Sequence, residues 1–111
     1  MTLTRGDVVL VDAPFHQRPG TKVRPVHCLA GCRDHDFLGI PVISVDRPDS
    51  IDVPIVDLLA AGLNRASFAR VHKVLLHRKS ALQRRVGRLS PTDLAKVTGT
   101  LCNALCNQQV S

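Results

Sequence analysis

The chain has 111 residues, a length that predicts one folded domain spanning residues 1–111. Hydrophobic residues make up 44% of the chain and charged residues 22%, a balance that favours a globular core and disfavours a disordered chain. Trp and Tyr are absent and Phe occurs 3 times, so we expect a core built mostly from Val, Leu, Ile and Ala.

Basic residues outnumber acidic ones by 15 to 9, which gives a formal net charge of +6 at pH 7. Such an excess attracts polyanions, and nucleic acid is the commonest of them. Clustering of the basic residues favours this interpretation over the alternative that the charge only keeps the protein in solution. The two clusters are Arg18, Lys22 and Arg24, and Lys73, His77, Arg78, Lys79, Arg84, Arg85 and Arg88.

Nothing in the sequence predicts secretion or contact with a membrane. Residues 1–5 are polar, and no apolar run approaches the ~20 residues that a membrane span needs. The expected location is therefore the cytoplasm, where disulfides are rare.

The cysteines form two pairs, Cys28/Cys32 and Cys102/Cys106, with the same spacing in each pair. A tetrathiolate zinc site is one interpretation. Free buried or half-buried thiols are favoured, because zinc-binding pairs usually lie in tight turns that contain glycine. Cysteines one helical turn apart can also pack simply as small hydrophobic side chains. We therefore expect no metal and no cofactor.

Short apolar runs separated by turn-forming residues predict five or six β-strands. Loops are expected over residues 16–23, which contain Pro19-Gly20, and over residues 46–50, which contain Arg47-Pro48-Asp49. One helical turn is expected over residues 57–61. The predicted strands span residues 7–12, 24–30, 37–44, 51–56, 67–76 and 84–89.

The clearest predicted element is a C-terminal amphipathic helix. Ser90 suits the N-cap, Pro91 suits the first helical position, and Asp93 lies where the acid of a capping box belongs. Short strands followed by one helix predict a mainly β (α+β) fold, a small closed or half-closed barrel whose open side the helix covers. The apolar residues that recur at helical spacing, over roughly four turns, are Leu94, Val97, Leu101 and Leu105.

The chain lacks Gly-x-Gly-x-x-Gly, Walker and His-Glu-x-x-His sequences, which disfavours nucleotide-dependent and metalloprotease chemistry. Three other motifs occur in order along its first half: Gly6-Asp7-Val8-Val9-Leu10-Val11-Asp12, Lys22-Val23-Arg24-Pro25-Val26 and Pro41-Val42-Ile43-Ser44. In this order and spacing they resemble the MazF/PemK toxin family. Stretches of the second half, such as residues 85–90, agree, so the resemblance spans about residues 5–105.

The resemblance implies an SH3-like barrel with a C-terminal helix, acting as a homodimer. It also implies a toxin that cleaves single-stranded RNA, mostly messenger RNA, with sequence selectivity. A cognate antitoxin protein would neutralise such a toxin. Composition and periodicity by themselves establish only a basic, strand-rich domain that ends in a helix.

Cleavage of RNA without a metal uses the 2′-hydroxyl of the substrate as nucleophile and leaves a 2′,3′-cyclic phosphate and a 5′-hydroxyl end. The enzyme must align the reacting oxygens, neutralise charge on the phosphoryl oxygens and transfer protons. Arg24 is the candidate for the charge, because a guanidinium matches a phosphate with two parallel hydrogen bonds. The resemblance gives the Arg of this Arg24-Pro25 pair a catalytic role.

Ser44 matches a position where the family usually carries Thr, and its hydroxyl can donate to a phosphate oxygen or assist the leaving group. The alternative is a strand-end serine that bonds only to the backbone. A general base is harder to assign, because an arginine side chain is a poor base. His16, in the loop before Arg24, is the candidate helper. His27 follows Arg24 by an odd offset, which predicts the opposite face of the strand.

Five further residues are candidates for binding RNA through phosphates and base edges: Phe15, Gln17, Arg18, Lys22 and Arg47. Phe15 is the only aromatic residue near the predicted site, so hydrogen bonds, stacking by arginine and charge must supply most of the binding. Arg70 and Lys73 are interpreted as a solvated face of the strand predicted over residues 67–76. The alternative is that they support the site.

Two other functions stay open at this point. One is a catalytically inactive or gyrase-inhibiting relative on the same barrel, which the Arg24-Pro25 and Ser44 pattern disfavours. The other is a basic module that binds nucleic acid without catalysis, which explains the charge but not the ordered motifs.

Overall fold

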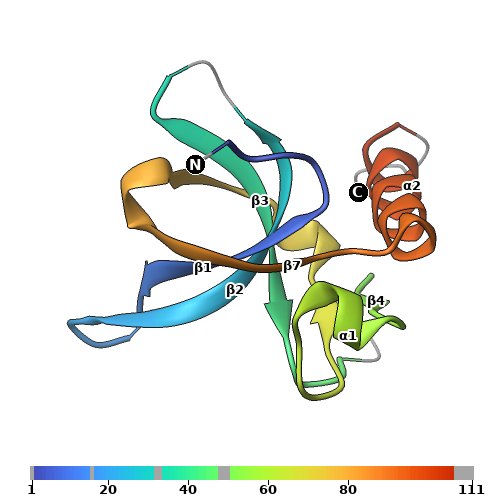
Figure 1. Ribbon diagram of the computed structural model, residues 1–111, viewed down its shortest axis with the longest axis horizontal. Coiled ribbons are helices and arrows are strands. Elements are labelled where there is room, and N and C mark those ends of the chain that lie inside the picture. Colours follow the sequence, from blue (N-terminus) through green and yellow to red (C-terminus); the bar gives the residue numbers. More distant parts are fainter. Residues whose placement is uncertain (1, 16, 32–33, 48–50, 107–111) are drawn as a thin grey trace.

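The computed structural model describes residues 2–15, 17–31, 34–47 and 51–106 (Figure 1). Over these residues the predicted mainly β fold with a C-terminal helix is confirmed. In chain order the elements are β1 (Asp7–Pro14), β2 (Thr21–Gly31), β3 (Asp36–Ile43), β4 (Val53–Pro54), α1 (Leu58–Ala61), β5 (Phe68–Ala69), the 3-10 helix η1 (Val71–Lys73), β6 (Leu75–Arg78), the 3-10 helix η2 (Lys79–Ala81), β7 (Leu82–Arg88) and α2 (Pro91–Cys106).

The strands form an antiparallel sheet in the order β4-β5-β3-β2-β1-β7. β6 is an additional strand that pairs with β3. β3 is the central strand, because it is the only strand of the described residues that pairs with three others. One edge pairs with β2 as far as Val26↔Pro41. The other edge pairs with β6 at its beginning and with β5 at its end, where Val42 faces Ala69. β3 therefore joins the N-terminal hairpin to two segments from the second half of the chain.

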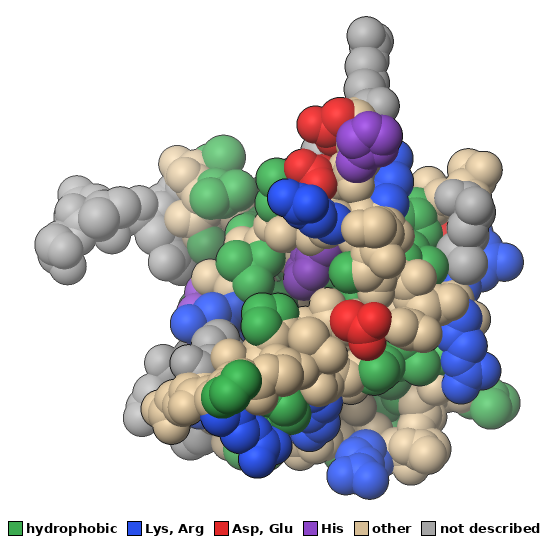
Figure 2. Space-filling model, turned by 90° about the vertical axis from the view of Figure 1, so that its left-hand side faces the viewer, with side chains coloured by type: hydrophobic (Ala, Val, Ile, Leu, Met, Phe, Trp, Pro, Cys, Tyr) green, Lys and Arg blue, Asp and Glu red, His purple; other side chains and the backbone are tan. Residues whose placement is uncertain are grey.

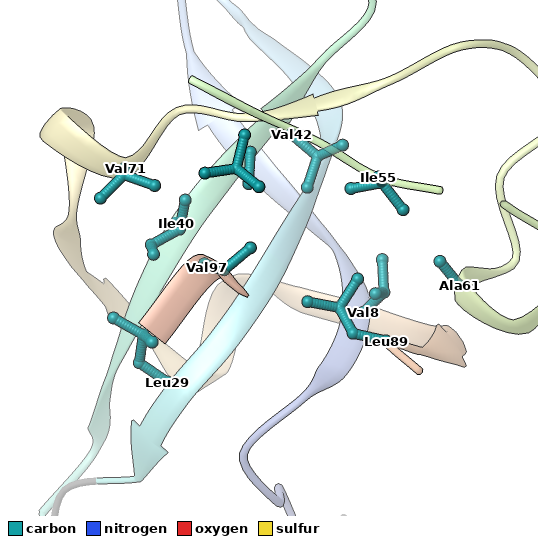
Figure 3. Close-up of a cluster of buried hydrophobic side chains, with 11 residues drawn as sticks. Val8, Leu29, Ile40, Val42, Ile55, Ala61, Val71, Leu89 and Val97 are labelled. Atoms are coloured by element: carbon teal, nitrogen blue, oxygen red, sulfur yellow. The ribbon is translucent and has the colours of Figure 1, made fainter. Parts of the chain in front are cut away.

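The main core lies on one face of this sheet, which we call the first face. Ala61 from α1 and Val97 from α2 complete it (Figure 3). Burying a Val, Leu or Ile side chain contributes about 1.5–3 kcal/mol, so this cluster is the largest hydrophobic contribution to stability. Its buried members are Val8, Leu29, Ile40, Val42, Val53, Ile55, Ala61, Ala69, Val71, Leu89 and Val97.

The opposite face, which we call the second face, carries a smaller cluster of Val9, Val11, Val26, Cys28 and Phe37. Alternation along a strand explains the division, since neighbouring residues such as Val8 and Val9 point to opposite sides of the sheet. Both clusters are buried, so β2 is covered on both faces from Val26 to Leu29, whereas its first three residues are exposed.

The single strand predicted over residues 67–76 is wrong. The chain pairs with the end of β3 only through β5, then turns at Arg70 and forms η1, which the hydrogen bond from Lys73 N–H to the Arg70 carbonyl closes at 2.9 Å. After η1 it pairs with the beginning of β3 as β6. Val71 is buried, whereas Leu75 and Leu76 are exposed, so the apolar run contains no continuous buried face.

The strand predicted over residues 51–56 is shorter than expected and contains only Val53 and Pro54. Pro54 has no N–H to extend the ladder. The loop predicted over residues 16–23 is also shorter, because β2 already begins at Thr21. Part of the loop predicted over residues 46–50 lies outside the described residues.

The helix expected at the C-terminus is confirmed as α2. Ser90 caps it by accepting a hydrogen bond from Asp93 N–H at 3.1 Å. The capping-box role of Asp93 is wrong, because its buried carboxylate accepts hydrogen bonds from the N–H groups of Val56 and Asp57 instead. Asp93 therefore fixes α2 to the segment that precedes α1. Neither helix of the described residues is long and apolar enough to cross a membrane.

The helical turn expected over residues 57–61 is also confirmed as α1. The Asp57 side chain accepts a hydrogen bond from Ala60 N–H, and Gly62 ends the helix with a φ of 74°. A Cβ atom at Gly62 would overlap the Val86 carbonyl, and one at Gly87 would overlap the backbone of Ala61. α1 and β7 therefore touch through their backbones, and glycine is required on both sides of the contact.

Replacing Gly87 with Ala should lower the free energy of unfolding by about 1–3 kcal/mol, because the added methyl group must push α1 away from β7. Gly99→Ala in the middle of α2 is the matched control, since a Cβ there meets no heavy atom within 4 Å. That change should raise stability by about 0.5–1 kcal/mol through helix propensity. Urea unfolding measures both, and wild-type stability in Gly87→Ala would contradict the α1–β7 contact.

His27 is an unusual member of the interior. It pairs with Val8 and Ile40, is completely buried, and neither of its ring nitrogens has a hydrogen-bond partner. Burial, together with the positive charge of Arg5, lowers the pKa of His27 from 6.5 to about 4. The folded protein therefore holds His27 neutral, on the face opposite Arg24, as its odd offset predicts.

The lowered pKa of His27 predicts a loss of stability in weak acid. The unfolded chain binds a proton below pH 6.5, and the folded protein does so only below about pH 4, so stability is complete above 6.5 and falls between these values. Between pH 7 and pH 5, wild-type protein should lose about 2 kcal/mol more than His27→Leu. Urea unfolding of the pair measures the difference, and equal losses would refute the assignment.

Candidate nucleic-acid interface

Arg24 lies on the second face of the sheet, near the beginning of β2. Its register partner on β1 is Val11, and Val26 follows two residues later on the same face. The Arg24 side chain is half-buried, and its Nε is buried without a hydrogen-bond partner. No carboxylate among the described residues pairs with it, whereas Asp7 pairs with two other arginines, Arg85 and Arg88.

Ser44 follows directly after the last residue of β3 and is exposed. The ladder between β2 and β3 stops at Val26↔Pro41, so Arg24 and Ser44 both lie beyond its end. From this point the β1–β2 hairpin and the end of β3 run in different directions (Figure 1). The two predicted catalytic residues thus lie past the same end of the β2–β3 ladder, and no hydrogen bond joins them.

The turn of the β1–β2 hairpin carries the residues predicted to bind RNA. Gln17, Arg18 and Lys22 are exposed there. Phe15 is half-buried, and the Arg18 guanidinium lies over its ring at 4.0 Å from the centroid. One face of the Phe15 ring is therefore covered, and a base can stack there only on the outer side of Arg18. His16, the predicted helper, lies outside the described residues.

Arg47, the remaining predicted RNA contact, is exposed in the segment after Ser44. Figure 2 shows one face of the molecule, on which Lys and Arg side chains spread over the lower and right-hand parts. The acidic side chains in view gather mainly towards the top. Lys and Arg side chains thus cover more of this face than Asp and Glu side chains do, which suits the approach of a polyanion.

His77 also lies on the second face, where its ring stacks on Phe37 with centroids 5.4 Å apart. Gly39 leaves the space for this ring, since a Cβ there would overlap a Val26 methyl group and press against His77. Burial lowers the pKa of His77 below its ordinary value of 6.5, so the ring is neutral at pH 7. His77 therefore adds no charge to the basic cluster in which the sequence placed it.

A second group of polar side chains lies beside the end of β3. Asp52 has a side chain that is only 4% exposed, with both carboxylate oxygens buried and without hydrogen-bond partners. Arg70 Nε lies 3.8 Å and His72 Nδ1 lies 3.7 Å from the same oxygen, Oδ1. Arg70 Nη2 lies 3.1 Å from His72 Nε2. The interpretation of Arg70 as part of a solvated face is wrong, since its side chain is 19% exposed.

Sequence reasoning missed this group because Asp52 is far from the two other residues along the chain. Its only signal was the alternation of Arg70 with the apolar residues Ala69 and Val71. The pairing of β4 with β5, which brings Asp52 next to Arg70, cannot be read from either segment alone.

The cysteines are separated by their environments. Cys28 is buried on the second face, where burial and the charge of Asp7 raise the pKa of its thiol, and Cys102 and Cys106 are exposed on α2. Cys32 lies outside the described residues. Where the chain is described, no three His, Cys, Asp or Glu side chains converge as the ligands of a metal ion would.

Comparison with known proteins identifies the family. A profile of the PemK-like, MazF-like toxin of type II toxin-antitoxin system matches residues 4–105. The chain therefore belongs to this family of toxins, as the ordered motifs around Arg24 and Ser44 indicate. No curated protein matches the sequence closely enough to assign it further.

Several solved structures share the fold. An endoribonuclease in complex with its cognate antitoxin, from Mycobacterial species, has a TM-score of 0.78 at 15% identity, covering 98% of this chain and 100% of that one. MazF in a MazE–MazF structure from Deinococcus radiodurans gives 0.77 at 16% identity, with 97% and 99% covered. The Mycobacterium tuberculosis toxin MazF-mt6 gives 0.69 at 21% identity, with 91% and 99% covered. At such identities the likeness establishes the fold.

Proposed function

We propose that this protein is the toxin of a type II toxin-antitoxin system and that it cleaves single-stranded RNA without a metal ion. The 2′-hydroxyl of one nucleotide attacks the adjacent phosphorus and loses its proton, and the bond from phosphorus to the 5′-oxygen breaks. The 5′-oxygen gains a proton. The products are a 2′,3′-cyclic phosphate and a 5′-hydroxyl end.

The observation that carries this proposal is the partial burial of Arg24 without a hydrogen-bond partner for its Nε. A half-buried guanidinium with a buried, unpartnered Nε costs free energy in the folded protein. A phosphate would supply the missing charge and accept two parallel hydrogen bonds from the guanidinium. In the reaction, Arg24 would neutralise the charge that develops on the non-bridging oxygens as the phosphorus becomes five-coordinate.

Ser44 supports the same reaction from the end of β3. It is exposed and forms no hydrogen bond with a described residue, so its hydroxyl is available to donate to a phosphate oxygen or to the leaving 5′-oxygen. The proposed helper for proton transfer is His16, whose chemistry suits the task at neutral pH. His27 is unsuited, because it is buried on the other face.

Several further properties stay predictions for this chain. They are binding of RNA by Phe15, Gln17, Arg18, Lys22 and Arg47, neutralisation by a cognate antitoxin, assembly as a homodimer and a cytoplasmic location. The antitoxin is supported by the mycobacterial endoribonuclease and the Deinococcus toxin, whose structures include one. The homodimer is supported by the large apolar side chains on the surface, among them Leu38, Leu75 and Leu76.

Purified protein should cleave a long single-stranded RNA in EDTA and leave double-stranded RNA intact. Arg24→Ala should reduce the rate by at least about 100-fold, because it removes the charge that stabilises the transition state. Ser44→Ala should reduce the rate less, and Ser44→Thr should retain activity. Mapping the cut sites and identifying the end groups on the RNA measures these effects.

Arg65→Ala is the matched control, because it removes an exposed arginine that lies in neither basic cluster and should leave cleavage unchanged. Undiminished cleavage by Arg24→Ala would sink the assignment of Arg24. Strict dependence on an added divalent metal would sink the mechanism. A protein that inhibits DNA gyrase and cleaves no RNA would favour the gyrase-inhibiting alternative.

A further inference from the structure

Arg70 lies on the second face of the sheet, across β3 from Arg24. Its N–H donates a hydrogen bond to the carbonyl of Pro41 at 2.9 Å. On the other edge of β3, Pro41 pairs with Val26, two residues after Arg24. Ala69 is buried in the main core on the first face, so alternation directs the next residue, Arg70, to the second face.

Arg24 and Arg70 therefore flank the end of β3 from two sides. Adjacent strands lie about 4.8 Å apart, so in-register residues on the two neighbours of β3 have backbones about 10 Å apart, and Arg24 lies two residues beyond the last β2–β3 pair, Val26↔Pro41. Such a spacing allows each guanidinium to meet a different phosphate of one extended strand that crosses the end of β3.

The side chains around Arg70 hold its guanidinium in position, but they do not form a fully hydrogen-bonded ion pair with it. Asp52 lies 3.8 Å from Nε, which is beyond hydrogen-bonding distance, and its carboxylate is buried. The Nη2 group is directed to His72 Nε2 at 3.1 Å. No described residue forms a hydrogen bond with Nη1. Asp52 therefore attracts the guanidinium and fixes its direction without using all of its donors.

His72 also holds the guanidinium of Arg70 in position. Because Arg70 Nη2 can only donate, His72 Nε2 accepts, and the ring carries its hydrogen on Nδ1, which faces Asp52 Oδ1 at 3.7 Å. In this tautomer the Nδ1–H of His72 is directed towards the same Asp52 oxygen that lies nearest the Arg70 guanidinium. A bound phosphate would accept hydrogen bonds from the remaining N–H donors of Arg70. Asp52 and His72 would keep the guanidinium in position.

We propose that Arg70 is a second phosphate-binding residue for single-stranded RNA, and that Asp52 and His72 are the residues that position it. The proposal rests on the proposed function, because it assigns the path of the same RNA beyond Arg24. The strand would cross the end of β3 between the two arginines, with one phosphate at Arg24 and a flanking one at Arg70.

The test measures binding without cleavage. The probe is a labelled 2′-O-methyl RNA strand of mixed sequence, which lacks the attacking hydroxyl, and fluorescence anisotropy gives its dissociation constant over a range of salt concentrations. Arg70→Ala should weaken binding about tenfold and reduce the slope of log K against log salt by about 0.7, the contribution of one phosphate in a single strand. Arg65→Ala, which removes an exposed arginine before β5, should change neither quantity.

The positioning role of Asp52 has its own readout. Removing a negative charge normally tightens binding to a polyanion, so a structural or purely electrostatic role predicts tighter binding by Asp52→Asn. Loss of positioning predicts binding several-fold weaker in the wild-type background and no effect in Arg70→Ala. Thermal unfolding of each variant confirms that binding is measured on folded protein. Tighter binding by Asp52→Asn would overturn the positioning role.

The outcomes for Arg70 and for the proposed function are separable. If Arg24→Ala binds the probe more weakly while Arg70→Ala and its salt slope match wild type, the Arg70 proposal is overturned and cleavage at Arg24 is unaffected. If the slope falls as expected but wild-type protein cleaves no RNA, the phosphate-binding role of Arg70 is supported and the nuclease function fails. A wild-type protein that neither binds the probe nor cleaves RNA overturns both.

Discussion

The pairing of β3 along both edges is the constraint on which the rest of the structure depends. β2 occupies one edge, and β6 and β5 occupy successive parts of the other. The turn at η1 exists because the chain must leave the end of β3 and return to its beginning within a few residues. The same arrangement places Arg24, on β2, and Arg70, directly after β5, on either side of β3. The geometry of the candidate interface is thus a consequence of how the sheet is assembled.

The buried polar groups fall into two classes, those that have hydrogen-bond partners and those that do not. Asp7 and Asp93 are completely or nearly completely buried, but both have hydrogen-bond donors, from Thr4 and Arg88 and from Val56 and Asp57. Such groups fix the positions of their elements. Arg24 and Asp52 have buried atoms without hydrogen-bond partners, which costs free energy that folding alone does not recover. Both lie around the end of β3, where the proposed RNA strand would cross.

His27 shows that an unpartnered buried group need not belong to a site. It lies on the first face of the sheet, opposite Arg24, and burial lowers its pKa, so it is neutral at pH 7. The free-energy cost of burying His27 without hydrogen-bond partners lowers the stability of the folded protein instead. The two faces of the sheet therefore differ in role. The first face holds the main hydrophobic core, and the second combines a smaller core with the charged side chains.

The sequence by itself determined the mainly β fold, the first three strands, the C-terminal helix with its Ser90 cap, and the family through the motifs around Arg24 and Ser44. These features depend on neighbouring residues or on short periodic patterns, which a sequence displays directly. Only the tertiary structure decided the break of residues 67–76 into β5, η1 and β6. It also decided the partners of Asp93 and the meeting of Asp52 with Arg70 and His72. Those outcomes depend on which distant segment pairs with which edge of β3, and local alternation of apolar and polar residues carries no information about that choice.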